Sequence, residues 1–114
     1  MSHRILQING LLREHLANIL LRDVNFKESV LVTISKVETS PDLRNARVYI
    51  SALPETEYDY VMKTLRHERG RIQKELHAKL SMKPMPKISF TFDPTGSKAD
   101  EIEHLLKILE SEGE

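Results

Sequence analysis

The sequence VLVTISKVETSPDLRNARVYIS, residues 30–51, contains two strand-like segments separated by a turn. Residues 30–35 are short and β-branched, as strands often are, and residues 47–51 alternate polar and apolar side chains. Between them, residues 40–42 read Ser-Pro-Asp, which is typical turn chemistry. Because two strands joined by a short connection pair antiparallel, this stretch predicts a β-hairpin.

The segments on both sides of this hairpin have the spacing of amphipathic helices. Apolar residues recur at steps of three and four over residues 3–22, which predicts a first helix. After Pro54, apolar residues keep helical spacing as far as Leu80, but Gly70 stands in the middle, where it weakens a helix by about 1 kcal/mol relative to alanine. We therefore expect two helices, over about residues 55–68 and 71–81, with a kink or short turn at Gly70.

The C-terminal part of the chain predicts a third strand and a last helix. Residues 88–93 alternate clearly, with Phe90 and Phe92 expected to face the core. Ser97 is suited to cap a helix. The apolar residues of that helix are Ile102, Leu105, Leu106 and Leu109. The predicted order is αββααβ followed by a helix, an α+β domain with its helices on one face of a three-stranded sheet. We assign it to residues 1–110, followed by a frayed acidic end at 111–114.

The order of these elements is that of the type II KH arrangement, and residues 33–51 resemble the signature of the ribosome-binding factor A family, V-E-x-S-P-D-L-x-x-A-x-V-Y-x-S. The matching residues are Val37, Glu38, Ser40, Pro41, Asp42, Leu43, Ala46, Val48, Tyr49 and Ser51. Further positions that keep the family's spacing are Gly70, Arg71, Ile72, Glu75, Leu76, Pro86, Phe90, Asp93, Ile102, Leu105 and Leu106. The resemblance covers nearly the whole chain.

The resemblance implies a type II KH-like, monomeric and non-enzymatic factor of the bacterial cytoplasm that binds immature small (30S) ribosomal subunits. It also implies assistance to 16S rRNA processing near the 5′ end, important in the cold, without a cofactor, a membrane or a small-molecule substrate. The family replaces the Gly-x-x-Gly loop of KH domains by an Ala-x-Gly kink. That kink maps onto residues 68–70, where the glycine is present and Glu68 replaces the alanine.

Charge is distributed unevenly along a chain whose formal net charge is zero. Residues 63–87 contain eight lysines and arginines against two glutamates, net +6, whereas residues 88–114 contain two lysines against seven acids, net −5. A basic block can neutralise RNA phosphates, although a solvated charged face would have the same composition. The candidate RNA-binding residues are Lys63, Arg66, Arg69, Gly70, Arg71, Lys74, Lys83 and Lys87. The acidic C-terminal stretch is expected to be a solvated helix and tail, or alternatively a cover for the basic helices.

Aromatic residues, on which RNA bases often stack, are few in this chain. Tyr49 alternates outward from Val48 and Ile50, on a sheet face whose exposure the sequence does not reveal. The composition therefore favours recognition of RNA shape and backbone over base readout. Arg44 and Arg47 either add to an RNA surface or simply decorate a strand.

The sequence does not indicate an enzyme or a metal protein. It contains no cysteine, no phosphate-binding glycine loop and no zinc-ligand spacing among its five histidines. No apolar run has the roughly 18–20 residues that a membrane span needs. The alternatives that remain are a protein-interaction module with an α+β fold and a general KH-type single-strand binder. The missing Gly-x-x-Gly loop counts against the second.

Overall fold

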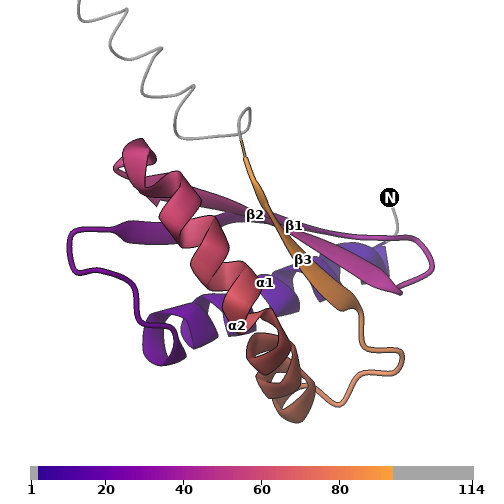
Figure 1. The fold of residues 1–114 in the computed structure, drawn as a ribbon. Helices are drawn as coiled ribbons and strands as arrows, with labels where there is room; N and C mark the ends of the chain where they lie inside the picture. The colour runs from indigo at the N-terminus through magenta and orange to yellow at the C-terminus, as the bar shows by residue number, and fades with distance from the viewer. Residues whose placement is uncertain (1–2, 94–114) are drawn as a thin grey trace, which may run out of the picture.

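The computed structural model describes residues 3–93, which fold into two long helices against a three-stranded sheet (Figure 1). The elements are α1 (His3–Asp23), β1 (Leu31–Thr39), β2 (Asn45–Leu53), the short 3-10 helix η1 (Glu55–Glu57), α2 (Tyr58–Lys79) and β3 (Lys87–Phe92). This order confirms the α+β class, the first helix, the hairpin and the third strand. The predicted last helix and the acidic end at 111–114 lie outside the described residues.

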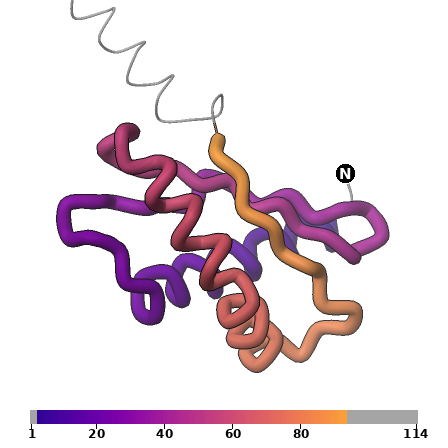
Figure 2. The backbone as a smooth tube through the Cα atoms, in the orientation of Figure 1, coloured from indigo at the N-terminus to yellow at the C-terminus, as the bar shows by residue number. Residues whose placement is uncertain are grey.

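The central strand of the sheet is β2, in the order β1-β2-β3. Strands β1 and β2 pair antiparallel, as expected of a hairpin, whereas β3 pairs parallel to β2. Parallel pairing requires a crossover connection, and α2 provides it, as the tube in Figure 2 shows. At the two ends of β3, the Lys87 amide donates to Arg44 O at 2.8 Å and the Asp93 amide donates to Ile50 O at 3.1 Å.

The turn between β1 and β2 is held by its own side chains, as predicted for the Ser-Pro-Asp sequence. The Ser40 hydroxyl donates to Asp42 Oδ1 at 2.6 Å, and the Arg44 amide donates to the same oxygen at 3.1 Å. These two hydrogen bonds stabilise the ionised carboxylate and lower the pKa of Asp42. The turn holds Leu43 at a φ of 62°, a left-handed conformation that is unfavourable for a residue with a side chain.

The core lies between the helices and one face of the sheet. Every second residue of β2 is buried on that face. These residues are Ala46, Val48, Ile50 and Ala52. Leu16 of α1 and Leu65 of α2 are fully buried against the same cluster, and Phe90 packs at its margin. Phe90 pairs with Val48 and Phe92 pairs with Ile50, so both phenylalanines lie on the helical side of the sheet as predicted, although both are only partly buried. The ring centroid of Phe92 lies 3.9 Å from that of Tyr58.

The prediction of two helices between Pro54 and Leu80 is wrong, because α2 runs without interruption from Tyr58 to Lys79 and passes through Gly70. Leu65 and Ile72, on the two sides of this glycine, are fully buried. Burial of each such side chain contributes about 1.5–3 kcal/mol, which outweighs the cost of about 1 kcal/mol for one glycine in a helix. Apart from its two chain neighbours and the backbone of the helix itself, no atom of the described residues lies within 4 Å of the position that a Cβ would take at Gly70.

Within residues 3–93, neither helix is both long enough and apolar enough to cross a membrane. The same part of the chain contains no cluster of three or more side chains able to hold a metal ion.

Candidate nucleic-acid interface

The outward side of α2 carries three exposed cations, Lys63, Arg66 and Lys74, with the exposed Gly70 between the last two. We call these four residues the α2 basic face. Helical periodicity places these residues opposite the buried stripe of the same helix. Among the described residues, no acidic side chain forms an ion pair with Lys63, Arg66 or Lys74. Their charges are therefore available to an anionic partner, in the arrangement expected for an unbroken helix.

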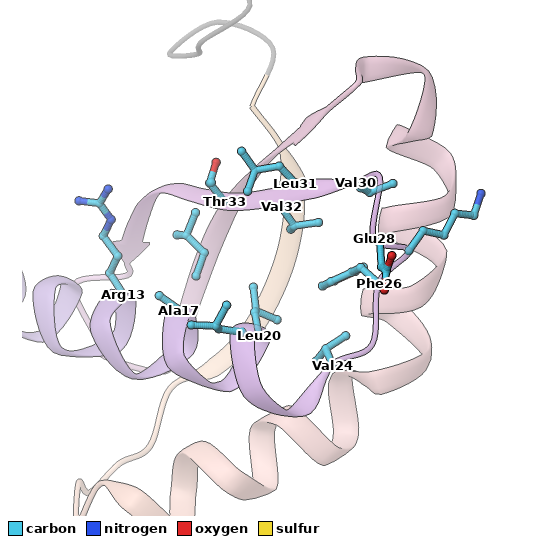
Figure 3. A pocket seen from close by; sticks show the side chains of 13 residues that line it. Arg13, Ala17, Leu20, Val24, Phe26, Glu28, Val30, Leu31, Val32 and Thr33 are labelled. Atoms are coloured by element: carbon cyan, nitrogen blue, oxygen red, sulfur yellow. The ribbon is translucent and has the colours of Figure 1, made fainter.

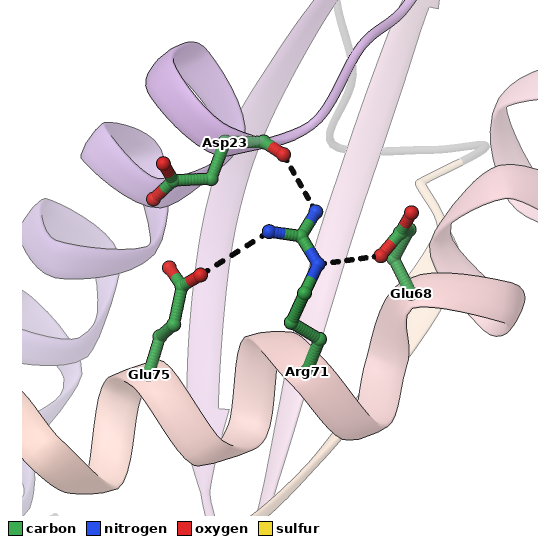
Figure 4. Close-up of polar contacts among 4 residues, drawn as sticks. All are labelled: Asp23, Glu68, Arg71 and Glu75. Atoms are coloured by element: carbon green, nitrogen blue, oxygen red, sulfur yellow. Dashed lines mark hydrogen bonds and ion pairs between the residues drawn. The ribbon is translucent and has the colours of Figure 1, made fainter.

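Arg71 is differently placed, because its guanidinium is held in a network between the two helices (Figure 4). Its Nε lies 2.8 Å from Glu68 Oε2, and its Nη1 lies 3.2 Å from Glu75 Oε1. Its Nη2 donates to the backbone oxygen of Asp23 at 2.6 Å, at the C-terminal end of α1. The hydrogen bond to Glu68 is the main cause that raises the pKa of Arg71. Arg71 therefore fastens α2 to α1, although its side chain is still 43 % exposed.

The same network contains two carboxyl groups that face each other, those of Asp23 and Glu75 (Figure 4). Glu75 Oε2 is buried and has no hydrogen-bond partner among the described residues. Two ionised carboxylates are both acceptors, so a bond between them requires a proton. The pKa of Glu75 is raised mainly by the hydrogen bond that its protonated form can make to Asp23. Burial also raises this pKa, whereas the charge of Arg71 lowers it.

Arg69 points to the other flank of α2, toward β3. Its Nη1 donates to Ile88 O at a long 3.4 Å. Beside it, the Gln73 amide nitrogen donates to Pro86 O at 3.0 Å, and its oxygen accepts from the Ile88 amide at 2.8 Å. Gln73 thus attaches the start of β3 to α2, a role that its sequence context does not indicate.

The remaining two candidates lie away from the α2 basic face. Lys83 is exposed in the loop between α2 and β3. Lys87 is the exposed first residue of β3 and pairs with Asn45, on the side of the sheet that the helices do not cover. The structure therefore brings together four of the eight candidates, engages Arg69 and Arg71 in contacts with β3 and α1, and separates Lys83 and Lys87 from the rest.

A groove of about 490 Å³ lies between α1 and β1 and was not predicted (Figure 3). Leu20 of α1 and Val32 of β1 point toward each other across it. Leu21 and Leu31, which also line it, are 82 % and 55 % exposed. The groove is mostly apolar and lacks convergent polar groups, so it does not have the lining of a site for a polar ligand.

Comparison with known proteins gives a consistent result over nearly the full length. The family model for ribosome-binding factor A matches residues 4–106. A ribosome-binding factor A of Chlamydia felis is 36 % identical over 115 aligned positions, covering 97 % of this chain and 96 % of that protein.

Two solved structures have a similar fold. The solution NMR structure of a Thermotoga maritima protein has a TM-score of 0.66 at 29 % identity, covering 83 % of this chain and 92 % of that one. A homology model of Thermus thermophilus ribosome binding factor A, fitted into the cryo-EM map of its 30S complex, has a TM-score of 0.62 at 23 % identity. That alignment covers 80 % of this chain and 92 % of the other, and at this identity it concerns the fold alone.

Proposed function

Because this chain belongs to the ribosome-binding factor A family, we propose that it binds the maturing small ribosomal subunit through the α2 basic face. The observation that supports the proposal is the row of exposed cations on α2, Lys63, Arg66 and Lys74, which form no ion pair within residues 3–93, in a chain of this family. The site of action is the bacterial cytoplasm. The process assisted is maturation of 16S rRNA near its 5′ end.

Binding alone is sufficient for this function, and the family is one of non-enzymatic assembly factors. A protein that binds one RNA conformation more tightly than another shifts the population toward it, by no more than the difference in binding free energy. Lys63 and Lys74 are eleven residues apart, which on a helix corresponds to about 16 Å. The α2 basic face is thus long enough to contact several successive phosphates.

Gly70 lies between Arg66 and Lys74 on this face and carries no side chain. The space beside it is open within 4 Å of the Cβ position, so an RNA backbone can approach the helix closely there. Arg69 and Arg71, on its two flanks, position the helix against β3 and α1. Arg71 retains two N–H groups beyond its three bonds and so adds positive charge beside the face.

The test is co-sedimentation with small subunits from cold-grown cells, comparing the wild type with a Lys63→Ala, Arg66→Ala, Lys74→Ala triple variant. A triple variant at Arg4, Arg13 and Arg22, which are exposed on α1, removes the same charge elsewhere and serves as the control. We expect the α2 variant to lose subunit binding and the α1 variant to keep it. Equal loading of the two variants and the wild type would refute the assignment of this surface.

Salt dependence separates RNA binding from the alternative of a protein-interaction module. Each phosphate contact contributes about −0.7 to −0.9 to the slope of log affinity against log salt concentration. Loss of three contacts should therefore make the slope less steep by about 2 to 3. A shallow slope in the wild type, together with a ribonuclease-resistant partner, would favour a protein partner instead.

A further inference from the structure

We propose that the side of the sheet opposite the helices is a second RNA-contact surface, where one unpaired base stacks on Tyr49 and Lys36, Arg47 and Lys87 hold the neighbouring phosphates. We call this side of the sheet the open face. That its ligand is RNA rests on the proposed function. The surface itself does not depend on the α2 basic face, since it is formed by the strands.

The open face has the chemistry of a surface for a polar, anionic partner. Its side chains alternate with the buried residues of β2 and are mostly polar or charged. Thr33 and Ser51 satisfy each other through a 2.8 Å hydrogen bond between their hydroxyls. A sheet face that is covered by a second protein layer is normally apolar. Lys36, Arg47 and Lys87 are exposed cations on this face, whereas Glu38 is its one exposed acid among the described strands.

Tyr49 lies at the centre of this face with a cation on each side. The Lys36 ammonium is 4.6 Å from the centroid of the tyrosine ring. The Arg47 Nη1 lies 3.5 Å from the Tyr49 hydroxyl, at the limit of a hydrogen bond. Lys36 pairs with Tyr49 across β1 and β2, so all three side chains lie on the same side of the sheet. The ring is partly exposed and thus accessible at its face once Lys36 moves.

An RNA base can displace Lys36 from the tyrosine ring. An exposed cation–π contact changes an equilibrium by about 2- to 5-fold, whereas a base stacked on an aromatic side chain changes affinity by about 5- to 150-fold. The displaced ammonium then meets the phosphate that the same nucleotide brings, so its charge is neutralised again. The contact between Lys36 and Tyr49 therefore places a phosphate ligand next to a stacking platform without blocking it.

Room for the nucleotide exists beside Arg47. A hollow of about 470 Å³ there is lined by polar side chains, among them Ser89 and Asn45. Glu38 lies directly across from Arg47 in the strand register and also lines the hollow. Its carboxylate repels a phosphate but can accept a hydrogen bond from a base amino group, so a base amino group fits beside Glu38 while the phosphates lie on Arg47 and Lys87. The acidic residue Asp93, which follows the C-terminal end of β3, is buried and accepts a hydrogen bond from Ser35, so it is not an exposed acid of this face.

The first experiment uses a fluorescent reporter at the proposed platform. The chain contains no tryptophan, so Tyr49→Trp introduces a single one. We expect saturable quenching of its fluorescence by an octamer of adenylate, because a base stacks on the indole. Heparin, a polyanion without bases, serves as the control and should leave the fluorescence unchanged. Absence of quenching by the octamer, or equal quenching by heparin, would overturn base stacking at this site.

The second experiment measures the affinity of the same octamer for the full chain by fluorescence anisotropy. Tyr49→Phe keeps the ring and should bind within about twofold of the wild type. Tyr49→Leu keeps an apolar side chain without a π face and should bind about 5- to 150-fold more weakly. Equal affinity of the leucine variant and the wild type would contradict the proposal. The phenylalanine variant also shows whether the strand tolerates substitution, as judged from its melting temperature.

These experiments can refute the proposal for the α2 basic face and the proposal for the open face independently of each other. If the α2 triple variant loses subunit binding while Tyr49→Leu keeps wild-type affinity for the octamer, the proposed function stands and the open face is not an RNA surface. If the α2 triple variant still loads onto subunits while Tyr49→Leu loses the octamer, the α2 assignment fails and the open face stands. Loss in both variants supports a domain that holds two RNA segments on opposite sides.

Discussion

The hydroxyl of Ser35 donates a hydrogen bond to Asp93 Oδ2 at 2.8 Å and so connects β1 to the residue that follows β3, across the central strand. Ser35 reaches it because the register of β1 against β2 shifts between Ile34 and Lys36, which leaves this serine as an extra residue in the strand. The Asp93 side chain that accepts the bond is almost entirely buried, with 2 % of the residue exposed.

Replacing Ser35 by alanine should therefore destabilise the domain by about 0.5–1.5 kcal/mol, the range for one hydrogen bond. The measurement is urea unfolding at neutral pH. Ser89→Ala is the matched control, because Ser89 is exposed on β3 and forms no side-chain hydrogen bond among the described residues. We expect the control to change stability by less than about 0.5 kcal/mol. Equal stability of the two variants would contradict a role for the cross-sheet bond.

Two adjacent leucines near the end of α1 should differ strongly in how much stability the domain loses when each is replaced by alanine. Leu20 is 5 % exposed in the core, whereas Leu21 is 82 % exposed beside the apolar groove. Leu20→Ala should cost about 2–5 kcal/mol through lost burial and a residual cavity. Leu21→Ala should stay within about 0.5 kcal/mol of the wild type. Thermal and urea unfolding of both variants measure this difference, and a large loss for Leu21→Ala would indicate that the groove is covered in solution.

Local patterns in the sequence are sufficient to predict most of this fold. The hairpin follows from alternation in residues 30–51, and the exposure of Lys63, Arg66 and Lys74 follows from helical spacing. Both signals depend on periods of two and 3.6 residues within a single element, so they are visible without knowledge of tertiary packing.

Contacts between distant segments are not encoded in such periods. Arg71 resembles the other cations of the basic block, yet it bonds to Asp23, 48 residues earlier, because α1 ends beside α2. The continuity of α2 through Gly70 likewise depends on burial of Ile72 against the sheet. Local propensity favours a break at Gly70, and tertiary packing overrides that preference.

Gly70→Ala should make the domain more stable by about 1 kcal/mol, because glycine is exposed in the middle of a continuous helix and alanine has the higher helix propensity. Beyond the backbone of the helix and the two chain neighbours, no atom of residues 3–93 lies within 4 Å of the added methyl group, so the substitution causes no clash there. Chemical unfolding measures the effect, with Gly10→Ala in α1 as a second exposed helical glycine for comparison. Destabilisation by Gly70→Ala would indicate that the helix is strained at this point.

Arg66 and Arg71 are both exposed arginines of α2, but we expect replacement of Arg66 to affect subunit binding and replacement of Arg71 to affect stability. Arg71→Ala removes the bond to Asp23 O and leaves Glu68 and Glu75 without their cation, so we expect a lower melting temperature. Arg66→Ala should leave the melting temperature unchanged and weaken subunit binding. The two variants are compared by thermal unfolding and co-sedimentation. A reversed pattern, with Arg66→Ala unstable and Arg71→Ala unable to bind yet stable, would contradict both assignments.

The Asp23–Glu75 carboxyl pair predicts a dependence of stability on pH. The pKa of Glu75 is raised above its ordinary value of 4.5 in the folded state, by the hydrogen bond that protonation permits with Asp23 and by burial. Between 4.5 and the raised value, the folded state holds more protons than the unfolded state, so the free energy of unfolding falls as pH rises through that window. Above the window, an ionised Glu75 faces Asp23, and the attraction of Arg71 and Lys79 only partly offsets the repulsion.

Glu75→Gln mimics the protonated side chain at every pH, because its amide can donate to Asp23 and cannot ionise. We expect this variant to be more stable than the wild type at pH 7 and to lose that advantage as the pH falls to 4, in urea unfolding at a series of pH values. Glu68→Gln is the control. It also removes a charge paired with Arg71, at 2.8 Å, but lies on the side of the guanidinium away from the Asp23 carboxylate (Figure 4). It should therefore destabilise the domain at pH 7, whereas stabilisation by both changes would show that total negative charge, rather than the pair with Asp23, governs the response.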